Sequence, residues 1–137
     1  MSHRVLVLDN SKQNAKAMAN AVQTADRDAV IDVVHTTKDA IAKVRGHASE
    51  FRYAIVDLVL DISPGSEQLD YTRGTNAFLD WLRGENLLAS IHVLVLSQST
   101  SILNNLDSGI AGRVKTYERS KGAHEESVAI KRFIEGL

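Results

Sequence analysis

Apolar residues in this chain fall into short continuous runs, and each run is followed by a stretch with helical spacing. The runs cover residues 4–9, 29–35, 53–58 and 91–97, and a weaker run interrupted by charges covers 113–117. Short runs rich in Val, Ile and Leu are typical of strands buried on both faces of a parallel sheet. The pattern therefore predicts five parallel strands.

Helical periodicity follows every run. After the first run, four apolar residues recur at i, i+3, i+4 and i+7, which places them on one face of a helix. These residues are Ala15, Met18, Ala19 and Val22. Comparable faces follow the other runs, formed by Ala40, Ile41 and Val44, by Phe78, Trp81 and Leu82, by Ile102, Leu103 and Leu106, and by Ala129, Ile130, Phe133, Ile134 and Leu137. Five β–α units in succession favour a doubly wound α/β sandwich with right-handed crossovers.

Capping signals mark two of the helices. Thr37 is expected to cap the second helix and Gly46 to end it. Glu125 and Glu126 stand in the first turn of the last helix, where the helix dipole favours acids.

The composition is ordinary for a globular protein, with 137 residues, 44% hydrophobic and 24% charged. We expect one domain over residues 1–137, which is long enough to bury a core. The net charge of −1 gives no global field for nucleic acid or an anionic membrane. The chain has no cysteine, and the apolar run within its first ten residues is too short for a signal peptide or a membrane span. A cytoplasmic protein without a direct nucleic-acid or membrane partner is expected.

Three of the predicted strands end in a polar residue, at Asp9, Asp57 and Ser97. Asp57 lies between two apolar runs, and an unpaired carboxylate in a core is costly. Ligands of open parallel sheets bind outside the carboxyl ends of the strands. We therefore expect Asp57 to project into a crevice there rather than to be buried. Each residue alone could be a turn residue or a helix cap, but the three together favour a site.

Other chemistries find no support in the sequence. The five histidines are scattered, without the close spacing of a zinc site. No glycine-rich nucleotide loop follows the first strand, and no G-x-S-x-G nucleophile elbow occurs.

Several short motifs occur in the order typical of one family. They are "VLVLDN" at 5–10, "YAIVDLVL" at 53–60, "VLVLSQS" at 93–99 and "YERSKGA" at 117–123, with Gly74 opening the third helix. Over essentially its whole length the chain resembles the receiver domain of two-component response regulators. The resemblance implies a flavodoxin-like (βα)5 fold with a five-stranded parallel sheet in the order 2-1-3-4-5.

The resemblance also implies a phosphoryl-transfer site. Asp57 would accept a phosphoryl group from a sensor histidine kinase or a phosphotransfer protein. Mg²⁺ would be bound by Asp9, Asn10, Asp57 and the backbone carbonyl of Val59. Such a protein is not an enzyme on a separate substrate; it assists its own phosphorylation and dephosphorylation.

The same resemblance assigns roles to three further residues. Lys121 would hold the phosphoryl oxygens, Ser97 would donate a hydrogen bond to the phosphate, and Tyr117 would change rotamer with Ser97 as the switch. Lys115 is the competing lysine, although its spacing from Ser97 fits the family less well. The remaining basic residues nearby, Arg113 and Arg119, are interpreted as part of a strand edge and not as a nucleic-acid surface.

Two departures from the family pattern bear on the site. Asn10 stands where the family has a second acid, and its neutral amide is a poorer metal ligand, so weaker Mg²⁺ binding is expected. Asp61 either restores that charge or belongs to a solvated loop. The loop 61–74 is longer than is usual and is either a tolerated insertion or a lid or partner-recognition element.

The resulting functional hypothesis is a stand-alone response regulator that signals by contact with a downstream protein or by onward phosphotransfer. A homodimer through the fourth helix, fifth strand and fifth helix is a further expectation. The alternative is an interaction module that kept the fold and works without phosphorylation, and a more distant one is a small phosphatase.

Overall fold

The computed structural model describes residues 3–57, 73–97, 113–119 and 122–137. A parallel sheet runs through its centre, with neighbouring strands in the order β2-β1-β3-β4-β5. The strands are β1 (His3–Leu8), β2 (Ala29–Val34), β3 (Phe51–Asp57), β4 (His92–Ser97) and β5 (Lys115–Glu118). The predicted five-stranded parallel sheet and its order are confirmed.

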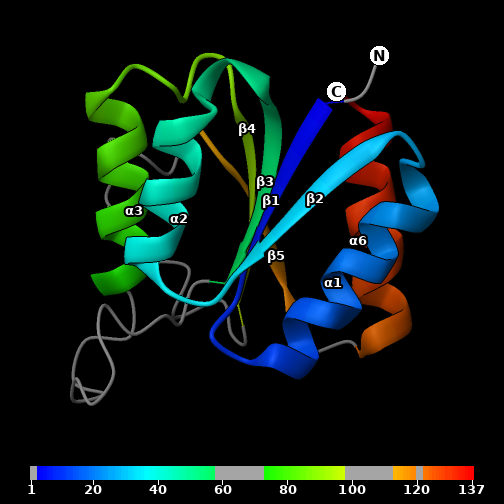
Figure 1. The fold of residues 1–137 in the computed structure, drawn as a ribbon. Helices are drawn as coiled ribbons and strands as arrows, with labels where there is room; N and C mark the ends of the chain where they lie inside the picture. Colours follow the sequence, from blue (N-terminus) through cyan, green and yellow to red (C-terminus); the bar gives the residue numbers. More distant parts are fainter. Residues whose placement is uncertain (1–2, 58–72, 98–112, 120–121) are drawn as a thin grey trace.

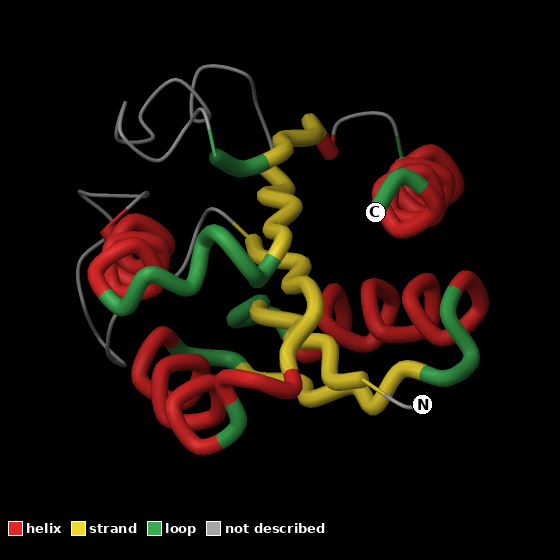
Figure 2. Tube along the Cα trace, turned by 90° about the horizontal axis from the view of Figure 1, so that it is seen from above, coloured by secondary structure: helices red, strands yellow, loops and turns green. Residues whose placement is uncertain are grey.

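Helices cover both faces of this sheet. They are α1 (Lys12–Ala25), α2 (Thr37–Gly46), α3 (Arg73–Gly84) and α6 (Ala123–Glu135), with a short 3-10 turn at Ala48–Glu50. Figure 1 shows α1 and α6 together on one face and α2 and α3 together on the other. Figure 2, seen from above, shows the twisted sheet running between the two helix pairs. The helix predicted around Ile102, Leu103 and Leu106 lies outside the described residues.

The central strands are buried on both faces, as their continuous apolar runs predict. Because strand side chains alternate between faces, Leu6 and Leu8 pack toward α2 and α3, while Val5 and Val7 pack toward α1 and α6. The sheet thus separates two apolar cores and holds the strand ends in fixed register.

Helix caps differ slightly from the prediction. Thr36, not Thr37, caps α2: its extended backbone lets the side chain accept a hydrogen bond from the Asp39 amide at 3.1 Å. Thr37 is the first helical residue and is buried. Gly46 is the last residue of α2, with His47 as its C-cap, and the acids Glu125 and Glu126 stand in the first turn of α6 as predicted.

The last strand is also displaced relative to the sequence pattern. It begins at Lys115 rather than at residue 113, and it ends at Glu118. Its register with β4 places Lys115 opposite Leu94 and Glu118 opposite Ser97. Arg119 therefore follows directly at the carboxyl edge of the sheet.

A partly buried hydrogen-bond network ties α1 to the sheet through Asp26, its C-cap. One Asp26 oxygen, Oδ2, accepts from the Tyr53 hydroxyl at 2.8 Å and contacts His3 Nε2 at 2.6 Å. Burial, together with the hydrogen bond to Asp26, raises the pKa of Tyr53 above its usual range. For Asp26, burial acts to raise the pKa, but the hydrogen bonds from His3 and Tyr53 outweigh it and lower the pKa.

This network predicts the effect of Tyr53→Phe. The substitution removes the hydroxyl that donates to the ionised Asp26 carboxylate, and it should lower the free energy of unfolding by about 1.5–3 kcal/mol at neutral pH. Since the pKa of folded Asp26 is depressed, its contribution is present above the unfolded value of about 3.9 and is lost as pH falls through the folded pKa. Urea unfolding should therefore show a lower free energy of unfolding for Tyr53→Phe at neutral pH, and a smaller difference from the wild type at about pH 3.

The matched control is Tyr117→Phe, which removes a hydroxyl from a half-buried tyrosine. It should change stability by less than about 0.5 kcal/mol. Equal losses in the two variants would show that the Tyr53–Asp26 bond does not stabilise the fold.

Candidate functional site

The three strand-end residues singled out in the sequence come together at one edge of the sheet. Asp9 directly follows β1, Asp57 closes β3 and Ser97 closes β4, and β3 lies between the other two strands. All three side chains are buried: the residues are 1%, 5% and 0% exposed, respectively. The structure thus places two carboxylates and a hydroxyl on adjacent parallel strands.

Burial of Asp57 differs from the expectation that this carboxylate projects into an open crevice. Its Oδ1 accepts a hydrogen bond from Nη1 of Arg119 at 2.9 Å. The same nitrogen donates to Oδ2 of Asp9 at 3.1 Å. A charged group can be buried when it is paired and hydrogen-bonded, and Arg119 provides that pairing for both acids.

Arg119 is itself buried, at 8% exposed, and its guanidinium is fully engaged. Besides the two aspartates, its Nε and Nη2 donate to the two oxygens of Glu126, at 3.1 and 3.0 Å. Nη2 also contacts the Met18 sulfur at 3.7 Å. A guanidinium has five N–H donors, and these five contacts account for all of them. The side chain is therefore held in one orientation.

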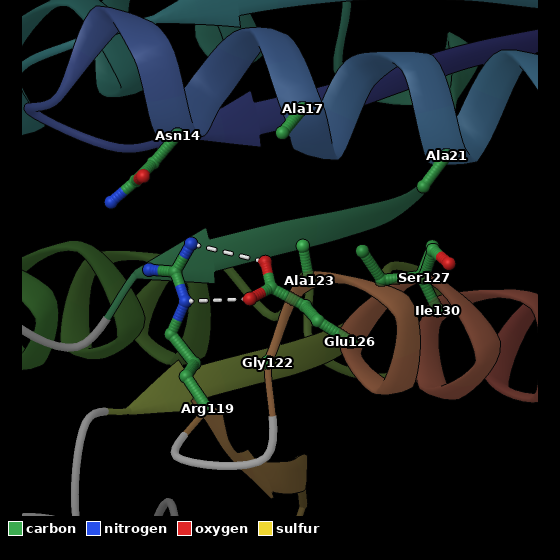
Figure 3. A pocket seen from close by; sticks show the side chains of 9 residues that line it. All are labelled: Asn14, Ala17, Ala21, Arg119, Gly122, Ala123, Glu126, Ser127 and Ile130. Carbon is green, nitrogen blue, oxygen red and sulfur yellow. Dashed lines mark hydrogen bonds and ion pairs between the residues drawn. The ribbon is translucent and has the colours of Figure 1, made fainter.

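The elements around Arg119 explain why it reaches the acids. Strand β5 delivers it to the carboxyl edge, one residue beyond the pair formed by Glu118 and Ser97. Glu126 lies on α6, which packs against α1, and it binds the guanidinium in a two-pronged contact of the kind that carboxylates favour with arginine. Figure 3 shows this pair facing a pocket of about 230 Å³ between the two helices. Its walls include Asn14 and Ala17 of α1.

The charges of the site act on the pKa values of its members. Burial raises the pKa of Asp9, against the opposing effects of the Ser11 backbone amide, which donates to Asp9 Oδ1 at 2.9 Å, and of Arg119. Burial alone would lower the pKa of Arg119, but Glu126, Asp57 and Asp9 together raise it. Arg119 therefore stays charged, and it is shared by three carboxyl groups.

The remaining residues predicted for the site are placed as follows. Asn10 directly follows Asp9 and is exposed. Tyr117 is half-buried on β5 and packs against the core below α1 and α6. Lys115 is exposed at the start of β5, opposite Leu94, and so lies away from the carboxyl edge. Val59, Asp61 and Lys121 lie outside the described residues, as does nearly all of the loop 61–74.

The described residues do not fit a divalent cation in this arrangement. Mg²⁺ requires close, near-octahedral oxygen ligands. One oxygen of each aspartate already accepts from the same arginine nitrogen, and the neighbouring amide of Asn10 is a weak ligand. Among the parts of the chain that the structure describes, no group of three or more His, Asp or Glu side chains could hold a metal ion.

Sequence reasoning missed Arg119 and Glu126 as site residues. The signal that could have found Arg119 is its position at the end of the fifth strand, where the rule that sheet ligands gather at carboxyl ends applies. Glu126 was noted only for its favourable place in the first turn of α6, and its contact with Arg119 depends on how α6 packs.

Many solved structures similar to this one are response regulators or their receiver domains. The chemotaxis response regulator CheY4 of Vibrio cholerae superposes with a TM-score of 0.71 at 16% identity, covering 97% of this chain and 99% of that chain. A response regulator receiver domain protein from Clostridium thermocellum gives 0.70 at 12% identity, covering 97% and 94%. The phosphorylated cyanobacterial phytochrome response regulator RcpA gives 0.69 at 17% identity, covering 98% and 93%. The sequence matches no family model and no curated protein.

The chain has the receiver-domain fold. This similarity confirms the resemblance drawn from the motifs at the level of architecture. Searched for membrane spans, the described part of the receiver-like chain contains no helix that is long and apolar enough to be one.

Removal of the arginine should expose the cost of burying its acids. Arg119→Gln keeps a polar side chain but leaves Asp9 and Asp57 without their cation, and breaking a buried ion pair costs about 3–5 kcal/mol. The pKa of Asp9 is raised in the folded state, so protonation of Asp9 stabilises the fold. This stabilisation is fully present below the pKa of Asp9 in the unfolded chain, and it is lost as pH rises through the pKa in the folded protein. The difference in free energy of unfolding between the wild type and Arg119→Gln, measured with urea, should therefore shrink as pH is lowered from neutral to about pH 5.

Arg83→Gln is the matched control. Arg83 pairs with Asp80 at 2.6 Å on the exposed surface of α3, where an ion pair contributes only about 0–1 kcal/mol. A deficit for Arg119→Gln as small as that of the control, or one that grows as pH falls, would contradict the buried pairing.

Proposed function

We propose that this protein is a signalling receiver of a two-component system, with Asp57 as the residue that accepts a phosphoryl group. The observation that carries the proposal is the placement of Asp57 at the carboxyl end of the central strand, beside Asp9 and in contact with a buried cation. The receiver-domain fold supports the same conclusion. The phosphoryl donor would be a sensor histidine kinase or a phosphotransfer protein.

The chemistry proposed for Asp57 is nucleophilic attack on phosphorus. A carboxylate oxygen forms a bond to the phosphorus of a phosphohistidine, the phosphorus–nitrogen bond breaks, and the histidine leaves with a proton from solvent. Strand β3 is buried along its whole apolar length, which gives the nucleophile a rigid support. Arg119 offers positive charge where the anionic phosphoryl group must approach two carboxylates.

The output proposed for this receiver is protein contact. A downstream protein partner, onward phosphotransfer and a homodimer through β5 and its flanking helices remain predictions from the sequence. The cytoplasmic location has the same status. The use of Mg²⁺ is also a prediction from the sequence, and the contacts of Arg119 with Asp9 and Asp57 argue against it. The protein would act as a phosphoryl acceptor rather than as an enzyme on a separate substrate.

A second candidate function is an interaction module that works without phosphorylation. The observation in its favour is the guanidinium of Arg119, which pairs both aspartates inside the fold. A site whose acids are already paired with a buried guanidinium and hydrogen-bonded is stable without a phosphate. The first experiment below separates the two functions.

Asp57→Asn keeps the shape of the side chain and removes the nucleophile. The wild-type protein incubated with a small phosphodonor such as acetyl phosphate should gain one phosphoryl group by intact mass, and the variant should gain none. Asp80→Asn, on the exposed face of α3, is the matched control and should be phosphorylated like the wild type. A wild-type protein that stays unmodified even with a cognate kinase would favour the interaction module.

Ser97→Ala tests the proposed switch. Ser97 closes β4 one residue beyond the pair formed by Asp57 and Leu96, and it is buried. Its proposed role is to donate a hydrogen bond to a phosphate on Asp57. A hydrogen bond to a charged group contributes about 1.5–3 kcal/mol, enough to shift a two-state equilibrium by one to two decades. The variant should still accept phosphate but lose most of the response in amide hydrogen exchange across residues 98–122. A full response in Ser97→Ala would exclude this coupling.

A further inference from the structure

We infer that Arg119 is the resident cation of the acid site and that it excludes a divalent metal ion from Asp9 and Asp57. The inference concerns which cation neutralises the two carboxylates. It does not depend on whether Asp57 is phosphorylated, because the tests below measure metal binding and not phosphoryl transfer.

The first argument is position. Nη1 of Arg119 lies 2.9 Å from an oxygen of Asp57 and 3.1 Å from an oxygen of Asp9. A metal ion held between the two carboxylates would need an oxygen of each at about 2.1 Å in a near-octahedral shell, in the space where Nη1 of Arg119 lies. A guanidinium and a divalent cation repel each other and cannot both occupy the space between them, so binding of one displaces the other.

The second argument is how firmly the arginine is held. Its Nε and Nη2 form a two-pronged contact with Glu126, and that carboxylate comes from a different element, α6. For a metal to enter, Arg119 would have to leave all three acids at once. Lysine could not replace this arrangement, because its three donors on one nitrogen cannot match the planar fork of a guanidinium.

The third argument is charge. Among the described residues that pair at this site, three carboxyl groups exceed the single positive charge of Arg119, and this excess favours cations. Metal exclusion therefore rests on occupancy and not on a lack of acidic ligands. Without the arginine side chain, the two buried carboxylates would lose the guanidinium that lies between them, and a divalent ion could take that space.

The test compares Mn²⁺ binding to the wild-type protein and to Arg119→Gln, by isothermal titration calorimetry and by the loss of the free Mn²⁺ electron paramagnetic resonance signal. If the guanidinium leaves the site in one molecule in ten or fewer, its removal should tighten the apparent affinity at least about tenfold. Mn²⁺ should also raise the melting temperature of Arg119→Gln and leave that of the wild type unchanged.

Two matched variants check that the increase in Mn²⁺ affinity arises from binding at Asp9 and Asp57. Arg83→Gln removes the same charge from an exposed ion pair and should bind Mn²⁺ like the wild type. The double variant Asp9→Asn with Arg119→Gln restores the net charge but removes one ligand, so it should lose the gain. Equal affinity in the wild type and Arg119→Gln, or a gain shared with Arg83→Gln, would overturn the inference.

A measurement on the wild type keeps the test decisive even if Arg119→Gln does not fold. The Nε–H signal of Arg119 in a nitrogen–proton spectrum reports the contact with Glu126 directly. Millimolar Mg²⁺ should leave its chemical shift unchanged, because the guanidinium stays in place. A saturable shift of this signal with added Mg²⁺ would show that the metal enters and displaces the arginine, and it would overturn the inference.

Discussion

The carboxyl edge of this sheet depends on one guanidinium placed among three carboxyl groups. Asp9 and Asp57 are buried, and Arg119 offsets the cost of their burial by donating to both from a single nitrogen. The bonds bring together β1, β3, the end of β5 and, through Glu126, helix α6. The same contact that permits the acids to be buried therefore also fixes the last third of the described chain against the first.

The fold could be predicted from the sequence because its signals are local and repeated. Each strand is a continuous apolar run, and each described helix shows an apolar face at helical spacing, so the parallel sheet follows from pattern alone. The element ends were less predictable. Thr36 and Thr37 have the same capping chemistry, and only the backbone conformation decides that the first accepts the bond from Asp39. Strand β5 begins two residues later than predicted, because charged residues interrupt the apolar pattern that marks its start.

The candidate site could be predicted in part. The two aspartates and Ser97 were found because strand ends in a parallel sheet share an edge, and that rule needs no knowledge of side-chain packing. Arg119 was not found, because several basic residues near the fifth strand look alike in the sequence. Lys121, the cation that the sequence predicts, lies outside the described residues. The choice of Arg119 depends on where β5 ends and on a carboxylate from α6, and both are set by tertiary packing.

The sequence distances spanned by Arg119 have a consequence for how the protein is made. Its partners Asp9 and Asp57 precede it by 110 and 62 residues. During synthesis from the N-terminus both acids leave the ribosome long before their cation, and the early strands must wait in a state where these carboxylates are hydrated. Closing so long a loop is also among the slower events of folding. The contacts of Arg119 with both acids therefore cannot form before the chain has been made through the end of β5.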